Sequence, residues 1–159
     1  MIAMKNAQHT LVQFLFPVAR AMLAATFIVS ALRHITHWSG ALDEMAADGM
    51  PRSSFLLLGS IAFRLIGGLS VLLGIRARFG AALLVVFIVP AAFLAHDFWA
   101  MPAARQTHET IEFLNNLAMA AGALLIALNG PGPWSIDAIK ETRLSPRGQL
   151  SNSLSPEFT

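Results

Sequence analysis

Two long apolar stretches decide the fold: residues 11–32 read LVQFLFPVARAMLAATFIVSAL, and residues 55–75 read FLLLGSIAFRLIGGLSVLLGI. Each is long enough to cross the hydrocarbon core of a bilayer, which takes about 20 helical residues. Each also carries an arginine near its centre, Arg20 and Arg64. A cation there costs about 2.5–3.5 kcal/mol of insertion free energy. The stretches therefore predict membrane helices whose arginines face a polar bundle interior and find partners there.

The overall composition is that of a membrane protein. Hydrophobic residues make up 55% of the chain and charged residues 13%, and the mean hydropathy is +0.61, whereas soluble domains carry about 25% charged residues. Two further apolar stretches, 79–95 and 111–128, bring the predicted spans to four. A soluble apolar core is the alternative for stretches of this length, and a cleaved signal peptide is the alternative for the first one. The central Arg20 argues against a signal peptide.

We therefore predict an all-α protein, a transmembrane four-helix bundle with a disordered C-terminal tail. The bundle is expected to occupy residues 1–139, with helices at about 11–33, 55–75, 78–96 and 109–128. From Pro131 onward the sequence is rich in Pro, Gly, Ser and Asn and cannot build a core. Residues 140–159 are accordingly predicted to form a disordered cytoplasmic tail.

The distribution of lysine and arginine predicts the orientation in the membrane. The side that holds both termini and the 74–80 turn carries six of these cations: Lys5, Arg76, Arg78, Lys140, Arg143 and Arg147. The other side carries three: Arg33, Arg52 and Arg105. Both termini are therefore predicted to be cytoplasmic.

Polar residues inside the predicted helices share faces at a helical period of 100° per residue. On the first helix an arc of about 140° holds Arg20, Thr26, Ser30, Arg33, His34 and His37. On the fourth an arc of about 120° holds His108, Glu109, Glu112, Asn115 and Asn116. The second helix presents a narrow, mostly small face of Ser60, Arg64, Gly67, Gly68 and Val71. These stripes predict a polar pocket open to the non-cytoplasmic side.

Arg64 is the central residue of this predicted pocket. From mid-span its long side chain can extend toward Glu112 and the amides of Asn115 and Asn116. One interpretation is an internal salt bridge that locks the bundle, since polar residues often join membrane helices. The other is a site for an anion or a substrate headgroup. For Arg20 the sequence identifies no partner.

Four histidines, His34, His37, His96 and His108, map to one membrane face and raise the alternative of a transition-metal site. Their spacing matches no zinc motif, so we expect separated histidines with ordinary hydrogen bonds and no bound metal. With no cysteine in the chain, disulfides and thiolate metal sites are excluded. No basic patch with interleaved aromatic residues indicates a nucleic-acid partner.

Several short motifs follow one another along the chain. They are Ser30-Ala-Leu-Arg33, Gly67-Gly68, His96-Asp97-Phe98-Trp99, His108-Glu109, Phe113-Leu114-Asn115-Asn116 and the run from Gly130 to Asp137. In this order they resemble the DoxX family of small bacterial four-helix membrane proteins, over about residues 14–139. The resemblance implies a multi-pass protein of the bacterial inner membrane, embedded in the lipid bilayer.

The resemblance also implies a redox-associated membrane subunit, because the family includes a membrane subunit of a thiosulfate:quinone oxidoreductase. It makes a quinone the candidate cofactor and oxidoreductase subunits the candidate partners. Whether the chain is an accessory subunit of a quinone-linked enzyme or a non-catalytic scaffold or anchor stays open. No catalytic residue is assigned. The candidate pocket residues are Arg20, Arg33, Arg64, His96, Asp97, His108, Glu109, Glu112, Asn115 and Asn116.

This chain departs from the pattern of the family at two positions. Many relatives carry an acidic residue where Arg64 stands and a lysine where Asn115 stands. If an acid–lysine pair links the helices in those relatives, a pair between Arg64 and Glu112 is expected to replace it here.

Overall fold

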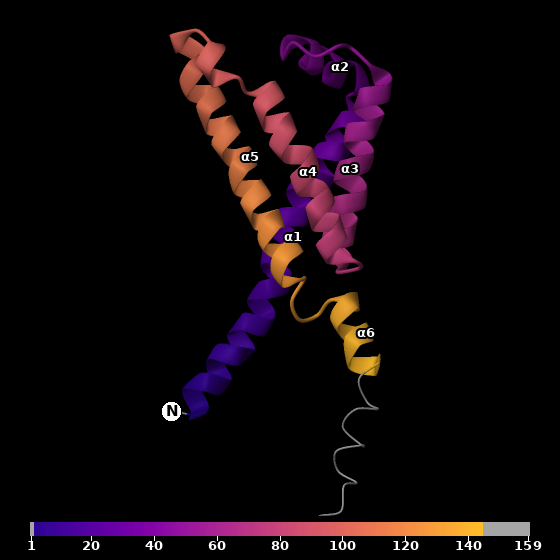
Figure 1. The fold of residues 1–159 in the computed structure, drawn as a ribbon, viewed down its shortest axis with the longest axis vertical. Coiled ribbons are helices and arrows are strands. Elements are labelled where there is room, and N and C mark those ends of the chain that lie inside the picture. Colours follow the sequence, from indigo (N-terminus) through magenta and orange to yellow (C-terminus); the bar gives the residue numbers. More distant parts are fainter. Residues whose placement is uncertain (1, 145–159) are drawn as a thin grey trace, which may run out of the picture.

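The computed structural model describes the backbone of residues 2–144 and the side chains of residues 13–141. Within this range the chain is helical, and four helices are long and apolar enough to cross a membrane. They are α1 (Ile2–Thr36), α3 (Ser54–Leu73), α4 (Ala77–Ala95) and α5 (Ala103–Asn129) (Figure 1). The shorter elements are α2 (Trp38–Ala47), the 3₁₀ turn η1 (Phe98–Ala100) and α6 (Ile136–Leu144). The predicted all-α transmembrane four-helix fold is confirmed.

The long helices pack in the order α1–α3–α4–α5, so that α3 lies between α1 and α4. Glycines permit the close approach that membrane helices need. A Cβ atom on Gly67 would lie 2.6 Å from Cδ2 of Leu84 on α4, and one on Gly68 would lie 2.9 Å from Cγ1 of Ile28 on α1. The small face predicted on the second span is therefore the face that packs against both neighbours.

The apolar core and the outer surface divide as expected for a protein in lipid. The interior is filled mostly by small or branched side chains together with one phenylalanine, namely Ala24, Phe27, Val71, Ala81, Leu84, Ile88, Ala120 and Ala123. Large apolar side chains such as Phe55, Phe79 and Val86 point outward and are exposed. In a bilayer this apolar surface lies against lipid instead of water, and lipid is its stable environment.

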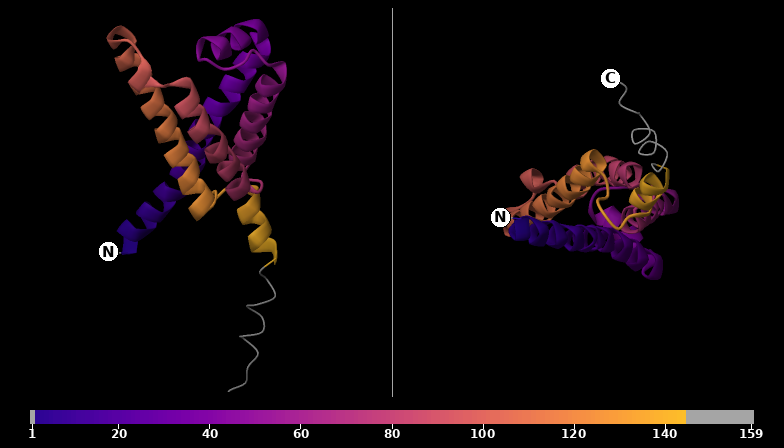
Figure 2. Two further views of the ribbon diagram at one scale, coloured as in Figure 1. Left: turned by 45° about the horizontal axis from the view of Figure 1, so that its top comes forward. Right: turned by 90° about the horizontal axis from the view of Figure 1, so that it is seen from below.

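The bundle has two distinct ends. The N-terminal part of α1, the turn between α3 and α4, and α6 lie at one end, which we name the α6 end (Figures 1 and 2). Helix α2 and η1 lie at the other, the α2 end. Both ends of the described chain are thus on the same side of the spans. Which side faces the cytoplasm remains a prediction.

Three features differ from the prediction. Helix α2 lies in what was expected to be a loop, and α1 and α5 begin at Ile2 and Ala103, several residues earlier than expected. Helix α6 also runs through residues 140–144, the first part of the predicted tail. This helix is held by a bond from the backbone N–H of Asp137 to the carbonyl of Gly74, 2.8 Å long. Residues 145–159, the rest of the predicted tail, lie outside the described range.

Candidate functional site

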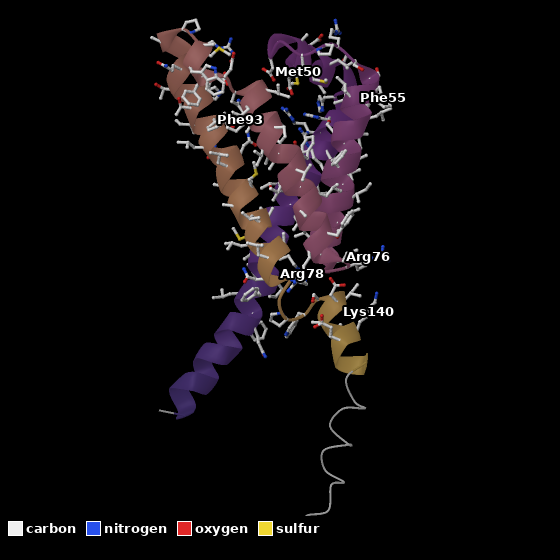
Figure 3. The ribbon with its side chains drawn as sticks, viewed as in Figure 1. Met50, Phe55, Arg76, Arg78, Phe93 and Lys140 are labelled. Carbon is white, nitrogen blue, oxygen red and sulfur yellow. The ribbon has the colours of Figure 1, made fainter. Side chains whose placement is uncertain are left out.

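A cavity of about 630 Å³ opens at the α2 end and is lined by residues from all five helices α1–α5. Pockets for small molecules usually measure about 300–1,000 Å³ and combine apolar walls with a few polar groups. Arg64 supplies a cation to this cavity, and Phe63, Phe87 and Leu94 supply apolar wall. Met50, from the connection between α2 and α3, lies at its upper rim (Figure 3).

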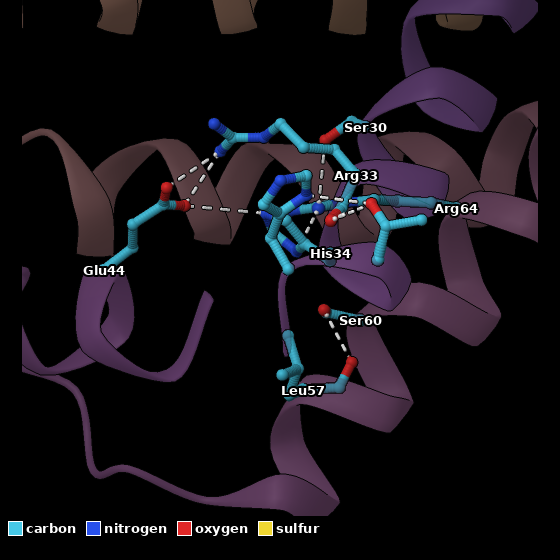
Figure 4. A network of polar contacts seen from close by, with 9 residues as sticks. Ser30, Arg33, His34, Glu44, Leu57, Ser60 and Arg64 are labelled. Atoms are coloured by element: carbon cyan, nitrogen blue, oxygen red, sulfur yellow. Dashed lines mark hydrogen bonds and ion pairs between the residues drawn. The ribbon is translucent and has the colours of Figure 1, made fainter. Parts of the chain in front are cut away.

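The Arg64 guanidinium is anchored to α1 through one of its nitrogens. Nη1 donates to Oγ of Ser30 over 3.1 Å and contacts Nδ1 of His34 at 3.0 Å (Figure 4). Cζ of Arg64 lies 5.1 Å from the centre of the Phe87 ring, which is within cation–π range. Neither Nε nor Nη2 of Arg64 makes a hydrogen bond to a described residue. These N–H donors are therefore available to a ligand.

A chain of polar contacts leads from Arg64 to the mouth of the cavity. Because a guanidinium can only donate, Nδ1 of His34 must accept, and the imidazole then carries its proton on Nε2. That nitrogen lies 3.7 Å from Oε2 of Glu44 on α2. The same carboxylate accepts two bonds from Nη2 of Arg33, 2.8 and 3.1 Å long. The contacts connect the interior, through a half-buried histidine, to an exposed ion pair.

A second polar group lies across the cavity on α4 and α5. Nδ1 of His96 lies 3.0 Å from Oε2 of the buried Glu109, and Arg105 donates to the other oxygen of that carboxylate over 3.3 Å. His96 lines the cavity, and so do Glu112 and Asn116 further along α5. The side chains of Glu112 and Asn116 make no hydrogen bond within the described part of the chain. Both are therefore open to a bound molecule.

Helix α4 contributes a proline to the wall. Pro90 lies inside the helix and lines the cavity together with Val86. Proline has no N–H, so the carbonyl of Val86 lacks the donor that normally lies four residues ahead of it. The helix runs through this position without ending.

Asp48 lines the cavity at the end of α2. Burial raises the pKa of its carboxyl above the ordinary value, and the charges of Glu109 and Glu44 raise it further, against the opposing effect of His96 and Arg105. A raised pKa means that the folded state favours the protonated carboxyl over the ionised one more strongly than the unfolded state does.

Folding stability should therefore depend on pH through Asp48. The folded state binds the Asp48 proton more tightly than the unfolded state does. The stabilisation that results is fully present below the ordinary pKa of about 3.9, and it is lost as the pH rises through the raised pKa of the folded state. Asparagine cannot ionise, so we expect Asp48→Asn to remove this loss of stability at higher pH. The unfolding midpoint of the variant, measured against pH in detergent, should exceed that of the unaltered chain at neutral pH and approach it in acid. A difference that stays constant across the pH range would contradict the assignment.

The structure brings five of the ten predicted pocket residues to one cavity: Arg33, Arg64, His96, Glu112 and Asn116. Glu109 contacts His96 but does not itself line the cavity. Asp97, His108 and Asn115 do not line it either. The expected ion pair between Arg64 and Glu112 is wrong. Arg64 bonds to α1, because α1 is the neighbour of α3 on that side and α5 lies beyond α4.

Arg20 has a different place and role. Its side chain is 6% exposed at the α6 end, where Nη1 and Nη2 each donate over 3.0 Å to the carbonyls of Pro131 and Trp134. The prediction that Arg20 belongs to the pocket is therefore wrong. Its partners are two backbone carbonyls in the connection between α5 and α6.

The start of α6, which follows this connection, also caps α4. The two carboxylate oxygens of Asp137 accept the backbone N–H groups of Arg76 and Ala77, each over 2.9 Å. These are donors at the start of α4 that have no partner within their own helix. The run from Gly130 to Asp137 is thus a structural joint.

The histidines do not form one cluster in the described part of the chain. His34 contacts Arg64 and Glu44, His37 contacts Thr36, and His96 contacts Glu109. No group of three His, Asp or Glu side chains among the described residues is placed to hold a metal ion.

Sequence reasoning missed several side chains of the cavity and its surroundings. Glu44 and Asp48 belong to the unpredicted α2, and Phe87 looked like one more apolar residue of a span. Arg105 pairs with Glu109 one turn away on the same helix. That i, i+4 spacing was the signal that could have identified this pair.

Comparison with known proteins agrees with this architecture. The family model described as DoxX matches residues 15–97, and the SURF4 family model matches residues 57–142. Inner membrane protein YqjF of Escherichia coli (strain K12) is 34% identical over 77% of this chain and 88% of its own length. Inner membrane protein YphA of the same organism is 25% identical over 76% and 86%.

A more distant likeness reaches beyond bacteria. The Surfeit locus protein 4 homolog of Schizosaccharomyces pombe (strain 972 / ATCC 24843) is 32% identical over 45% of this chain and 24% of its own length. No solved structure matches. From the matched family model, the identity to YqjF and the four apolar spans, we conclude that this chain belongs to the DoxX family and is an integral, multi-pass protein of the inner membrane.

Proposed function

We propose that this chain is a redox-associated membrane subunit whose cavity binds the headgroup of a quinone and opens to the non-cytoplasmic side. The observation that carries the proposal is Arg64, held by Ser30 and His34 with its Nε and Nη2 donors unused, in the wall of a 630 Å³ cavity. The carbonyl oxygens of a quinone accept hydrogen bonds from such donors. Its flat ring suits contact with the apolar wall that Phe63 and Leu94 supply.

The charges around Arg64 favour a neutral acceptor over an anion. Glu44, Asp48 and Glu112 line the same cavity and would repel a carboxylate or a phosphate. A quinone carries acceptor oxygens without a net charge, so it gains hydrogen bonds without this repulsion. Asn116 offers a further donor on the α5 side.

The walls of the cavity continue into the lipid-facing surface. Val86 and Leu94 line the cavity and are 68% and 61% exposed, so their outer sides lie against lipid. A quinone is dissolved in the bilayer by its apolar tail, and the tail can stay there while the headgroup enters from the side. This route needs no passage through water.

Reduction of a quinone consumes protons as well as electrons, and polar residues could deliver the protons. The imidazole of His34 lies between Glu44 at the exposed mouth and Arg64 in the interior, and it is the group of this chain that can take up and release a proton. Arg64 keeps its protons and serves only in binding. In this proposal the chain supplies binding and protons, and a partner oxidoreductase subunit supplies the electrons. This keeps the hard redox chemistry on the cofactors.

The test measures how tightly a soluble short-chain ubiquinone binds to the purified chain in detergent. Quenching of tryptophan fluorescence reports the binding. Arg64→Met should weaken binding about ten- to a hundredfold, since a hydrogen bond to a charged group is worth about 1.5–3 kcal/mol. The matched control is Arg33→Met, which removes an exposed, already paired guanidinium at the mouth. It should change the affinity by about fivefold at most.

Equal binding by Arg64→Met and the unaltered chain would contradict the quinone site. No measurable binding by the unaltered chain would favour the alternative of a non-catalytic scaffold, in which the polar interior only joins helices. A fluorescence change that both arginine variants share would indicate partition into micelles and would likewise count against the site.

A further inference from the structure

We propose that the α6 end binds the phosphate of an anionic phospholipid, in a second cavity that is separate from the quinone site. This cavity measures about 580 Å³ and is lined by Arg76, Arg78, Phe79, Pro131, Lys140 and two carboxylates. Its three cations come from the α3–α4 turn, the first turn of α4, and α6. Figure 3 shows them around the junction where these elements meet.

The pairing of cations differs between the two ends of the bundle. At the α2 end three arginines each have a carboxylate partner: Arg33 with Glu44, Arg52 with Asp43, and Arg105 with Glu109. At the α6 end the described side chains form no ion pair with Arg76, Arg78 or Lys140. Apart from the mid-span Arg64, the described cations without an ion pair therefore gather at the α6 end, where an external anion can satisfy those that line the cavity.

Cations outnumber carboxylates in the lining of this cavity, three to two. Both oxygens of Asp137 accept backbone N–H groups at the start of α4, which holds that side chain in place. Glu141 is the other carboxylate of the lining and pairs with none of the three cations. A lipid phosphate can approach the guanidinium groups of Arg76 and Arg78 with bidentate geometry.

The position of the cavity suits a lipid better than a free ion. It lies where α3 ends at Leu73 and α4 begins at Ala77, which is the level of the headgroups for spans of this length. Phe79 lines the cavity and is 67% exposed toward the surface on which acyl chains lie. A phospholipid places its phosphate on the cations and its chains along this surface. Basic pockets between membrane helices bind acidic lipids in this way.

The joint described above keeps the cavity rigid. Arg20 holds the connection through the carbonyls of Pro131 and Trp134, and Asp137 holds the α3–α4 turn. The cationic side chains are therefore mounted on a backbone that is fixed before the lipid arrives. This reduces the ordering cost of binding.

The test uses the full chain in nanodiscs of phosphatidylcholine mixed with phosphatidylglycerol, with retained lipid counted by native mass spectrometry after extraction into detergent. We expect the unaltered chain to retain phosphatidylglycerol. The variant Arg76→Gln/Arg78→Gln/Lys140→Gln should lose about a hundredfold in affinity, since each cation near an anionic lipid contributes about fivefold. The control Arg33→Gln/Arg52→Gln/Arg105→Gln removes the same charge at the other end and should retain the lipid.

The single variant Lys140→Gln, at an exposed position, keeps the test usable if the triple variant does not fold, and about a fivefold loss is expected. Equal retention by the two triple variants, or equal loss, would overturn the proposal. Inorganic phosphate is added in a separate arm. Binding of phosphate without retention of phosphatidylglycerol would overturn the assignment of a lipid. The readout involves no quinone, so this test and that of the proposed function can fail independently.

Discussion

Gly74→Ala is expected to destabilise the folded protein by about 2–5 kcal/mol. Gly74 ends α3 with a φ of 67° and a ψ of 37°, in the left-handed region that costs alanine about 1–2 kcal/mol. A Cβ atom there would overlap Cβ of Ser135 and lie 3.1 Å from Nη1 of Arg20. Ser135 is fully buried, so the connection between α5 and α6 would have to move away.

The matched control is Gly49→Ala. Gly49 has a φ of 75°, and a Cβ atom there would have no neighbour within 4 Å. This variant carries the backbone strain without the collision, so it should lose only about 1–2 kcal/mol. The free energy of unfolding of both variants is measured in detergent, with far-UV circular dichroism as the signal. Equal destabilisation of the two variants would show that the approach of Ser135 to Gly74 does not contribute.

Arg20→Met is expected to cost about 3 kcal/mol of folding free energy, from the loss of two hydrogen bonds by a charged donor. The carbonyls of Pro131 and Trp134 would lose the donors that now satisfy them. Because those bonds attach the α5–α6 connection to α1, the loss should be local as well as global. Hydrogen exchange should increase in residues 130–137 before it increases in the centres of the spans.

Arg20→Lys separates charge from geometry in this joint. Lysine keeps the positive charge, but it replaces the planar fork of two nitrogens with one ammonium group. We expect an intermediate stability, with exchange in residues 130–137 still faster than in the unaltered chain. If Arg20→Met left exchange in this segment unchanged, the two carbonyl contacts would not hold the connection.

The spans were predictable because their signal is carried by composition and length alone. Each of the four spans is a nearly continuous apolar stretch of the sequence, and it can be recognised as a span without knowing which other helices pack against it. Helix α2 was missed because it is short and lies between polar residues, and its stability comes from packing, with Ala41 buried against Ala31 and Leu57. Helix α6 follows a segment rich in proline and glycine, where composition suggested disorder and Ser135 and Asp137 instead create a docked helix.

The site was predictable only where one residue type implied its surroundings. A cation in mid-span implied a polar interior, and Arg64 does lie in a cavity with polar groups. Its partners could not be deduced, because they depend on which helices are neighbours, and the sequence does not give the packing order. Arg20 was harder still, since its acceptors are backbone carbonyls 111 and 114 residues away, which leave no trace in side-chain patterns.

Pro90 leaves one backbone carbonyl of α4, that of Val86, without its helical donor. Val86 and Pro90 lie in the wall of the cavity that also holds the Arg64 guanidinium, which can only donate, and the Glu112 carboxylate, which accepts. A ligand with a hydroxyl group can satisfy an acceptor, and a ligand with only carbonyl groups cannot. A cavity that holds donors and acceptors can therefore discriminate between the hydroxyl and carbonyl forms of one headgroup.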